Sequence, residues 1–136
     1  MMETLKGRCE CKRVQFEVTG AINDFSHCHC SQCRRLHGAA FATFAGVERS
    51  DFRYISGEDA LKSYYSSRKN ERVFCGNCGS NILVASNLEP DVFYLSMSAL
   101  EGDPPRPNPY HAFVGSKAPW HEITDGAPQY DGVEPQ

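Results

Sequence analysis

The stretch Phe74-Cys75-Gly76-Asn77-Cys78-Gly79-Ser80 decides how this sequence folds. Its two cysteines are two residues apart, and they lie between two runs of strand-forming residues. In a zinc knuckle this spacing turns the chain tightly, so that both sulfurs face one Zn²⁺ ion at about 2.3 Å. Gly76 and Gly79 suit such a turn because glycine adopts positive φ without steric cost. A thioredoxin-like redox motif fits less well, because that motif opens a helix after a strand.

A second pair of cysteines, in Cys9-Glu10-Cys11, is the natural source of two further ligands, since a closed structural zinc site needs four. Alternate residues of a strand face opposite sides, so this pair must bend locally to direct both sulfurs at one ion. Its spacing is also poor for a relaxed disulfide. The alternative is that Cys9 and Cys11 are small buried hydrophobic residues. We favour ligation, which predicts a structural zinc held by Cys9, Cys11, Cys75 and Cys78.

The other three cysteines lie within six residues, in Cys28-His29-Cys30-Ser31-Gln32-Cys33. Three protein ligands leave one position of a tetrahedral zinc open, as in catalytic and ligand-exchanging sites. Three thiolates also make the ion a weaker Lewis acid than three histidines would, and a better partner for another soft ligand. The sequence therefore predicts a second zinc at Cys28, Cys30 and Cys33 that captures an incoming thiol and lowers its pKa.

Several charged or titratable residues surround this second cluster. His27 or His29 could supply a fourth ligand and close the site, but each is expected instead to be a hydrogen-bonded neighbour of the metal. Arg34 and Arg35 form either a solvated pair at a helix end or, with Arg34 first, a contact to an anionic substrate. The remaining histidines are expected to be structural or exposed: His37, His111 and His121.

Composition limits the class of protein. The chain has 136 residues, 40% of them apolar, which is enough for one domain with its own core. Acidic residues outnumber basic ones by 17 to 14, which argues against a nucleic-acid binder. The sequence shows neither a membrane-length apolar run nor an apolar signal core at its start. An odd number of cysteines, seven, points to metal or catalysis in a reducing cytosol, so a cytoplasmic location is expected.

Short runs of aromatic and β-branched residues, separated by turn-forming residues, predict a mainly antiparallel β domain. In the first run, Val14, Phe16 and Val18 alternate with polar residues, as in a strand with one buried face. One short helix is expected from Ser31, as N-cap, to Gly38. The proline-rich residues 101–109 predict an extended arm. Further strands are predicted over residues 41–47, 52–55, 61–65, 72–74, 82–85, 92–96 and 111–114.

These motifs, taken in order, resemble the glutathione-dependent formaldehyde-activating enzyme (Gfa) family, which shares its domain with centromere protein V (CENP-V). The resemblance rests on four segments that span the chain from Gly7 to about Gln129. They are Gly7-Arg8-Cys9-Glu10-Cys11, Cys28-His29-Cys30-Ser31-Gln32-Cys33-Arg34, the stretch from Phe74 to Ser80, and the late segment His111-Ala112-Phe113-Val114-Gly115-Ser116-Lys117-Ala118-Pro119-Trp120.

The resemblance implies a β-tent fold and two zinc ions, divided among the cysteines as above. It also implies a carbon–sulfur lyase that, written in reverse, adds glutathione to formaldehyde to give S-(hydroxymethyl)glutathione. On this basis residues 1–136 form one domain, with a core over about 5–129 and a C-terminal tail that frays. Fold alone does not fix function, so two alternatives stay open: a zinc-stabilised binding module without catalysis, and a thiol redox sensor.

Overall fold

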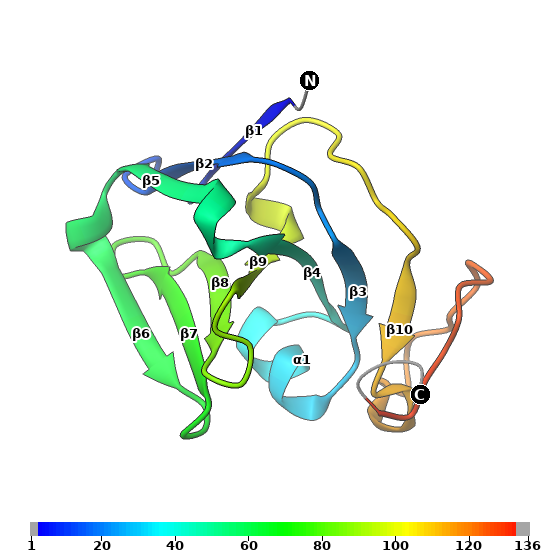
Figure 1. Cartoon of the computed structure of the whole chain (residues 1–136). Helices are drawn as coiled ribbons and strands as arrows, with labels where there is room; N and C mark the ends of the chain where they lie inside the picture. Colours follow the sequence, from blue (N-terminus) through cyan, green and yellow to red (C-terminus); the bar gives the residue numbers. More distant parts are fainter. Residues whose placement is uncertain (1–2, 133–136) are drawn as a thin grey trace.

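The computed structural model describes residues 3–132, and over these residues the fold is mainly β (Figure 1). A small antiparallel sheet contains β1 (Thr4–Arg8), β2 (Gln15–Thr19) and β5 (Phe52–Ser56) in that order. The larger sheet has seven strands, in the order β10 (Tyr110–Ala112), β3 (Asp24–Cys28), β4 (Ala42–Glu48), β9 (Val92–Ser96), β8 (Asn81–Ser86), β7 (Asn70–Cys75) and β6 (Leu61–Tyr65).

The larger sheet bends so that its two ends form facing walls (Figure 1). Strands β6 and β7 lie on one side of the view and β3 and β10 on the other, while the small sheet crosses the top. The helix α1 (Ser31–His37) lies between the walls at the open lower side. Short 3₁₀ turns follow or precede strands at η1 (Arg49–Asp51), η2 (Glu58–Ala60), η3 (Met97–Ala99) and η4 (Val114–Ser116).

The main core fills the space between the two sheets. Val14, Phe16 and Val18 are at most 1% exposed, which confirms the buried face predicted for this strand. They pack against residues of the larger sheet such as Val47 and Leu95. Burial of apolar side chains on this scale supplies about 1.5–3 kcal/mol for each large residue. The packing is what holds the small sheet across the top of the larger one.

A second, smaller core joins the helix to the larger sheet. Its buried members are Cys33 of α1 with Ala42 and Phe44 of β4, and Val84 and Tyr94 pack against them. The three-cysteine segment is therefore fixed by packing on both strands and helix. This is a different part of the molecule from the main core, which contains Cys9 and Cys75.

Most predicted strands are present, but the structure differs from the prediction in two strands, in the direction of one strand pair and in the cap of the helix. Strands β1 and β3 were not predicted, and β3 pairs with β10 in parallel rather than antiparallel fashion. The N-cap of α1 is Cys30 and not Ser31, because the Cys30 sulfur accepts the Cys33 backbone N–H. Gly38 ends the helix as predicted, in a left-handed conformation with φ of 59°.

Residues 101–109 contain neither helix nor strand, in agreement with the extended arm that their prolines predict. Among residues 3–132, none of the helical segments has the length and apolar character needed to cross a bilayer. The fraying expected at the chain end falls on residues 133–136, which lie outside the described residues. Up to residue 132 the tail is hydrogen-bonded to the segment around β10, for example through Phe113 N–H to the Gly132 carbonyl.

Candidate functional site

The two cysteine pairs that are predicted to hold the structural zinc are far apart in the sequence but meet in space. The sulfurs of Cys9, Cys11, Cys75 and Cys78 all lie within 4.8 Å of one another. The Cys9 and Cys11 sulfurs are 3.5 Å apart, and those of Cys11 and Cys75 are 3.8 Å apart. Sulfurs bound to one tetrahedral zinc at about 2.3 Å stand about 3.8 Å from each other. The donor set and its spacing therefore fit a closed zinc site.

The turn that presents Cys75 and Cys78 is held by its own backbone. The Gly79 N–H donates to the Cys75 carbonyl at 2.7 Å, and Gly79 has a φ of 84°, as predicted. The prediction of positive φ at Gly76 was wrong. Glycine is required there for space, because a Cβ would lie 2.9 Å from the Ala60 carbonyl oxygen.

The remaining three cysteines form a separate group at the start of α1. The sulfurs of Cys28, Cys30 and Cys33 also lie within 4.8 Å of one another. Hydrogen bonds with the Cys28 and Cys33 thiols lower the pKa of Cys30. Hydrogen bonds with Cys30 and Cys33, together with burial, raise the pKa of Cys28. One thiolate thus forms readily and the next does not. Full ionisation of this trio needs a nearby cation, which is the requirement a metal ion meets.

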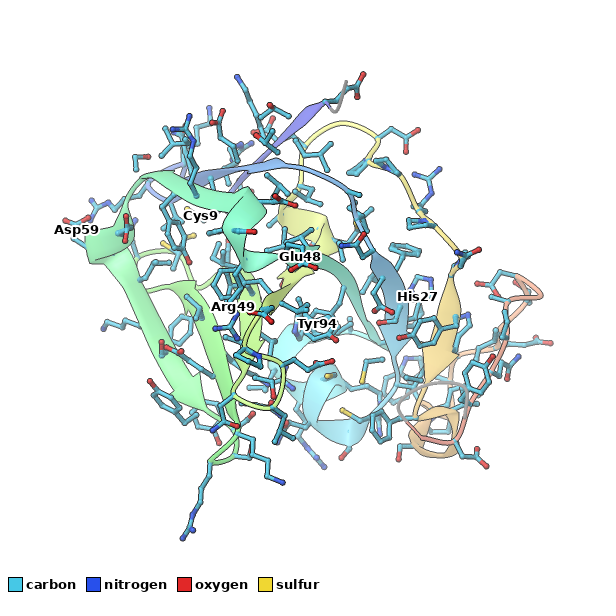
Figure 2. All side chains as sticks on the ribbon, viewed as in Figure 1. Cys9, His27, Glu48, Arg49, Asp59 and Tyr94 are labelled. Atoms are coloured by element: carbon cyan, nitrogen blue, oxygen red, sulfur yellow. The ribbon has the colours of Figure 1, made fainter. Side chains whose placement is uncertain are left out.

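A cavity of about 400 Å³ opens onto this trio. All three cysteines line it, and Phe44, Val84 and Tyr94 provide apolar and aromatic walls. In Figure 2, Cys9 of the four-cysteine cluster lies under the small sheet, whereas Tyr94, which lines this cavity, lies near α1. The cavity is large enough for a small thiol compound and its partner. None of the four cysteines of the other cluster lines this cavity.

Arg72 of β7 lines the same cavity and was not predicted as a functional residue. It is only 8% exposed, and its Nη2 donates to Gln32 Oε1 at 3.1 Å and to the Cys33 sulfur at 3.5 Å. Among residues 3–132 no carboxylate forms an ion pair with it, and its buried Nη1 has no hydrogen-bond partner. A buried guanidinium needs a negative partner, so the cysteine trio is the group that compensates it.

Arg34, the predicted substrate contact, does not line this cavity. Its guanidinium lies over the ring of Trp120, with its central carbon 5.9 Å from the ring centre. Arg35 is exposed. A role for Arg34 in substrate binding stays a prediction, and the structure places Arg72, and not Arg34, beside the sulfurs.

Neither neighbouring histidine joins the sulfur trio. His29 is fully buried, and its Nε2 is 2.8 Å from Nδ1 of His111. The Nδ1 of His27 is 2.8 Å from the Thr43 hydroxyl. Burial, followed by the proximity of His111, lowers the pKa of His29 to about 4, so its imidazole is neutral. His121 also stacks near His29. His111 and His121, which are far from His29 in the sequence, therefore belong to one histidine cluster with it.

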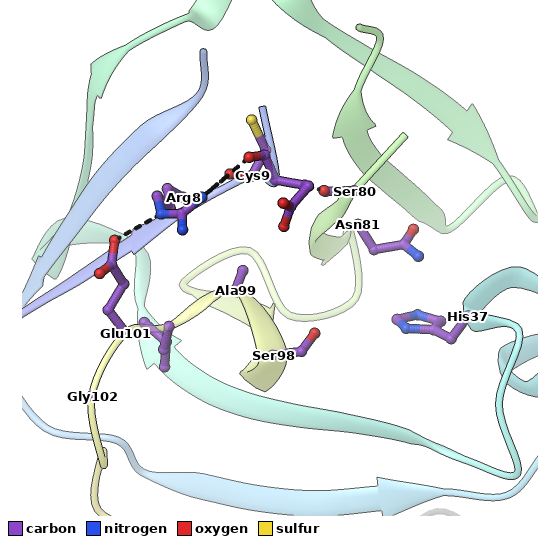
Figure 3. A pocket seen from close by; sticks show the side chains of 11 residues that line it. Arg8, Cys9, His37, Ser80, Asn81, Ser98, Ala99, Glu101 and Gly102 are labelled. Carbon is purple, nitrogen blue, oxygen red and sulfur yellow. Dashed lines mark hydrogen bonds and ion pairs between the residues drawn. The ribbon is translucent and has the colours of Figure 1, made fainter. Parts of the chain in front are cut away.

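A second cavity, of about 410 Å³, lies between the end of β1 and η3 (Figure 3). Its one nearby arginine, Arg8, is paired with Glu101 at 3.2 Å. Although Cys9 lines this cavity, Figure 3 shows its sulfur pointing away from Ser98 and His37. This cavity therefore lacks the available thiol and the unpaired cation that mark the first one.

The fold and the two sulfur clusters define a mainly β protein whose cysteines could bind metal. The family model of the glutathione-dependent formaldehyde-activating enzymes matches residues 4–116, and the chain belongs to this family. The likeness to the domain of centromere protein V stays a prediction.

The chain is 29% identical, over 88% of its length and 80% of the relative, to a Halomonas elongata protein provisionally named a glutathione-dependent formaldehyde-activating enzyme. It is 26% identical to an uncharacterized lyase of Schizosaccharomyces pombe, over 74% of this chain and 72% of that one. A crystal structure of a Rhodobacter sphaeroides protein is similar, with a TM-score of 0.62 and 31% identity over 74% of this chain and 91% of that one.

Proposed function

We propose that this protein adds glutathione, or a related thiol, to formaldehyde or another small aldehyde, with the carbon–sulfur lyase reaction running in the direction of synthesis. In this proposal Cys9, Cys11, Cys75 and Cys78 hold a structural zinc, and the trio at the start of α1 holds a second, exchangeable one. The family supports a glutathione-dependent, lyase-like activity on formaldehyde in general terms. The particular thiol and the particular aldehyde are part of the proposal.

One observation carries the proposal: three converging sulfurs border a cavity of about 400 Å³ and are not joined by a histidine. Had His27 or His29 completed the set, the site would have been closed and a purely structural role would follow. The histidines instead bond to Thr43 and His111. The arrangement therefore favours ligand exchange over a binding module.

The reaction itself needs few groups. The thiol loses its S–H proton, its sulfur forms a bond to the carbonyl carbon, the carbonyl π bond breaks, and a proton ends on the oxygen. A zinc ion held by the trio supplies the positive charge that lowers the pKa of the incoming thiol. The walls of the cavity bring thiol and aldehyde together, which replaces a slow encounter of two dilute molecules by a local reaction.

Arg72 supports this chemistry through charge. Three thiolates give the trio an excess of negative charge even with a divalent ion bound, and the guanidinium beside Cys33 offsets it. Less excess charge leaves the site better able to accept another anionic sulfur. The Nη1 atom of Arg72, which has no partner among the described residues, can also donate to a negative group of the bound thiol.

Proton NMR exchange spectroscopy tests the proposal directly. Glutathione and formaldehyde are mixed with and without the zinc-loaded protein, and the exchange rate between free and S-hydroxymethyl forms is measured. We expect catalytic amounts of protein to raise this rate on the order of 100-fold through proximity. A blank with the same concentration of free zinc controls for the metal alone. An unchanged rate, with metal analysis confirming both clusters loaded, would exclude formaldehyde activation.

Arg72→Met is expected to weaken zinc retention at the trio by about 10- to 100-fold, which is the usual effect of removing a group that contacts a metal ligand. Arg72→Lys keeps the charge but not the planar fork, so we expect an intermediate loss. Competition with a chromophoric chelator measures the affinity. Arg53→Met removes an exposed arginine paired with Glu17 and serves as the matched control. Equal zinc affinity in Arg72→Met and Arg53→Met would contradict a role for Arg72 at the trio.

A further inference from the structure

A third group of potential ligands lies outside both sulfur clusters. It consists of His27 on β3, His111 on β10 and Asp125 in the segment after η4, and one ligand atom from each lies within 4.8 Å of the others. His27 and His111 are direct partners in the register of the parallel strand pair. Their ring centres are 4.8 Å apart. Two strands of the sheet thus hold the imidazoles side by side on one face.

Each imidazole is oriented through its Nδ1 atom. The Nδ1 of His27 is 2.8 Å from the Thr43 hydroxyl, and the Nδ1 of His111 is 2.8 Å from Nε2 of His29. Histidines that bind metals are commonly held in this way, with one ring nitrogen on the metal and the other on a hydrogen-bond partner. This leaves Nε2 as the ring nitrogen of His27 that can meet a further ligand, and the Nε2 of His111 faces the Asp125 carboxylate.

The third member is also fixed in place. Nε2 of His111 lies 2.9 Å and 3.1 Å from the two carboxylate oxygens of Asp125. The backbone N–H of Ala127 donates to Asp125 at 3.0 Å, and this bond, with the nearby His111, lowers the pKa of the carboxyl group. Hydrogen bonds from His111 N–H to the Pro128 carbonyl and from Tyr130 N–H to the His111 carbonyl bind this segment to β10.

We propose that His27, His111 and Asp125 form a third metal site, for a divalent transition-metal ion such as Zn²⁺. Two imidazole nitrogens and one carboxylate suit zinc, nickel, cobalt or iron, whereas Mg²⁺ and Ca²⁺ prefer oxygen ligands alone. The His111 side chain is 3% exposed and that of Asp125 is 49% exposed, so an ion enters from the Asp125 side. The same atoms without an ion would form only a hydrogen-bonded chain from Asp125 through His111 to His29.

Occupancy of this site would act on the reactive trio through the backbone. His27 directly precedes Cys28, and the register of β3 and β10 continues from the His27–His111 pair to the Cys28–Ala112 pair. An ion joining β3, β10 and the C-terminal segment therefore fixes the strand that carries the first sulfur of the trio. None of the seven cysteines is among its three ligands, so the metal site can be tested separately from the thiol chemistry proposed above.

The test is a metal count on untagged protein, made by mass spectrometry after equilibration with buffered free Zn²⁺ and removal of unbound metal. We expect Asp125→Asn to bind one zinc fewer than the natural chain, because an amide is a much weaker ligand than a carboxylate. This change is on an exposed side chain and leaves the fold intact. His121→Gln is the matched control, since His121 packs against His29 and Phe41, which neighbour the ligand histidines, but is itself outside the ligand group. It is expected to keep the full count.

Long-range ¹H–¹⁵N spectra of the imidazoles give a second measurement, independent of the count. The Nε2 signals of His27 and His111 are expected to shift on zinc addition in the natural chain and to stay unshifted in Asp125→Asn. An equal zinc count in Asp125→Asn and the natural chain, or Nε2 signals unmoved by zinc, would overturn the proposal and leave the hydrogen-bonded chain as the correct description.

Discussion

Cys78→Ser is expected to leave the chain largely unfolded. The cluster to which Cys78 belongs joins the turn after β1 to the end of β7, and so ties the small sheet to the larger one. A structural zinc contributes folding free energy on the order of 10 kcal/mol. That is comparable to the entire stability of a domain this size, about 5–15 kcal/mol. A serine hydroxyl stays protonated and binds zinc poorly, so most of this contribution is lost.

Circular dichroism, the dispersion of amide signals in NMR, and the zinc count together measure this effect. Cys33→Ser is the matched control, because it makes the same chemical change in the second cluster. We expect it to remain folded and to lose only the exchangeable zinc. If the melting temperature fell equally in both variants, the division of the cysteines into one structural and one exchangeable group would be wrong.

Cys30→Ser is expected to lower the rate of thiol addition to formaldehyde by on the order of 100-fold, which is all of the acceleration ascribed to proximity. The substitution is informative because of the position of Cys30 at the N-cap of α1. Serine is among the best N-cap residues, so its hydroxyl can accept the Cys33 N–H in place of the sulfur. The helix therefore survives while one of the three sulfurs proposed to bind the exchangeable zinc is removed.

This variant separates folding from chemistry in one measurement series. Its melting temperature is expected to stay within a few degrees of the natural chain, as for a change that preserves a cap. Its zinc count should fall by one, and the NMR exchange rate should approach that of the blank. Full activity in a Cys30→Ser protein that has lost this zinc would show that the trio is not the site of reaction.

The sequence predicted the elements that carry strong local patterns. Residues 61–65 and 92–96 form strands with the predicted limits, because runs of aromatic and β-branched residues with turn signals at both ends define them. Strand β1 has one large apolar residue, Leu5, and β3 has Ser26 and His27 in its centre. These two strands are specified by pairing with their neighbours, which no local pattern reveals.

The cysteine groups were predictable for a related reason: ligand spacing is local, and counting assigned the remaining sulfurs. Arg72 and the histidine cluster were not, because their roles depend on contacts across the fold. His29 and His111 are 82 positions apart, and Arg72 is 39 positions from Cys33. One signal was available for Arg72, namely a charged residue inside an otherwise strand-like segment next to Val73 and Phe74. Such a residue is either solvated or paired, and the sequence alone does not say which.

The parallel pairing of β3 with β10 has a consequence for synthesis on the ribosome. The strand that delivers Cys28 to the reactive trio is an interior strand only after residues 110–112 have been added on its outer side. Until residues 110–112 have emerged, the nascent chain carries this segment as an unpaired edge, with three thiols beside it. A truncated translation product ending before Tyr110 would therefore expose both the edge of β3 and the sulfurs beside it.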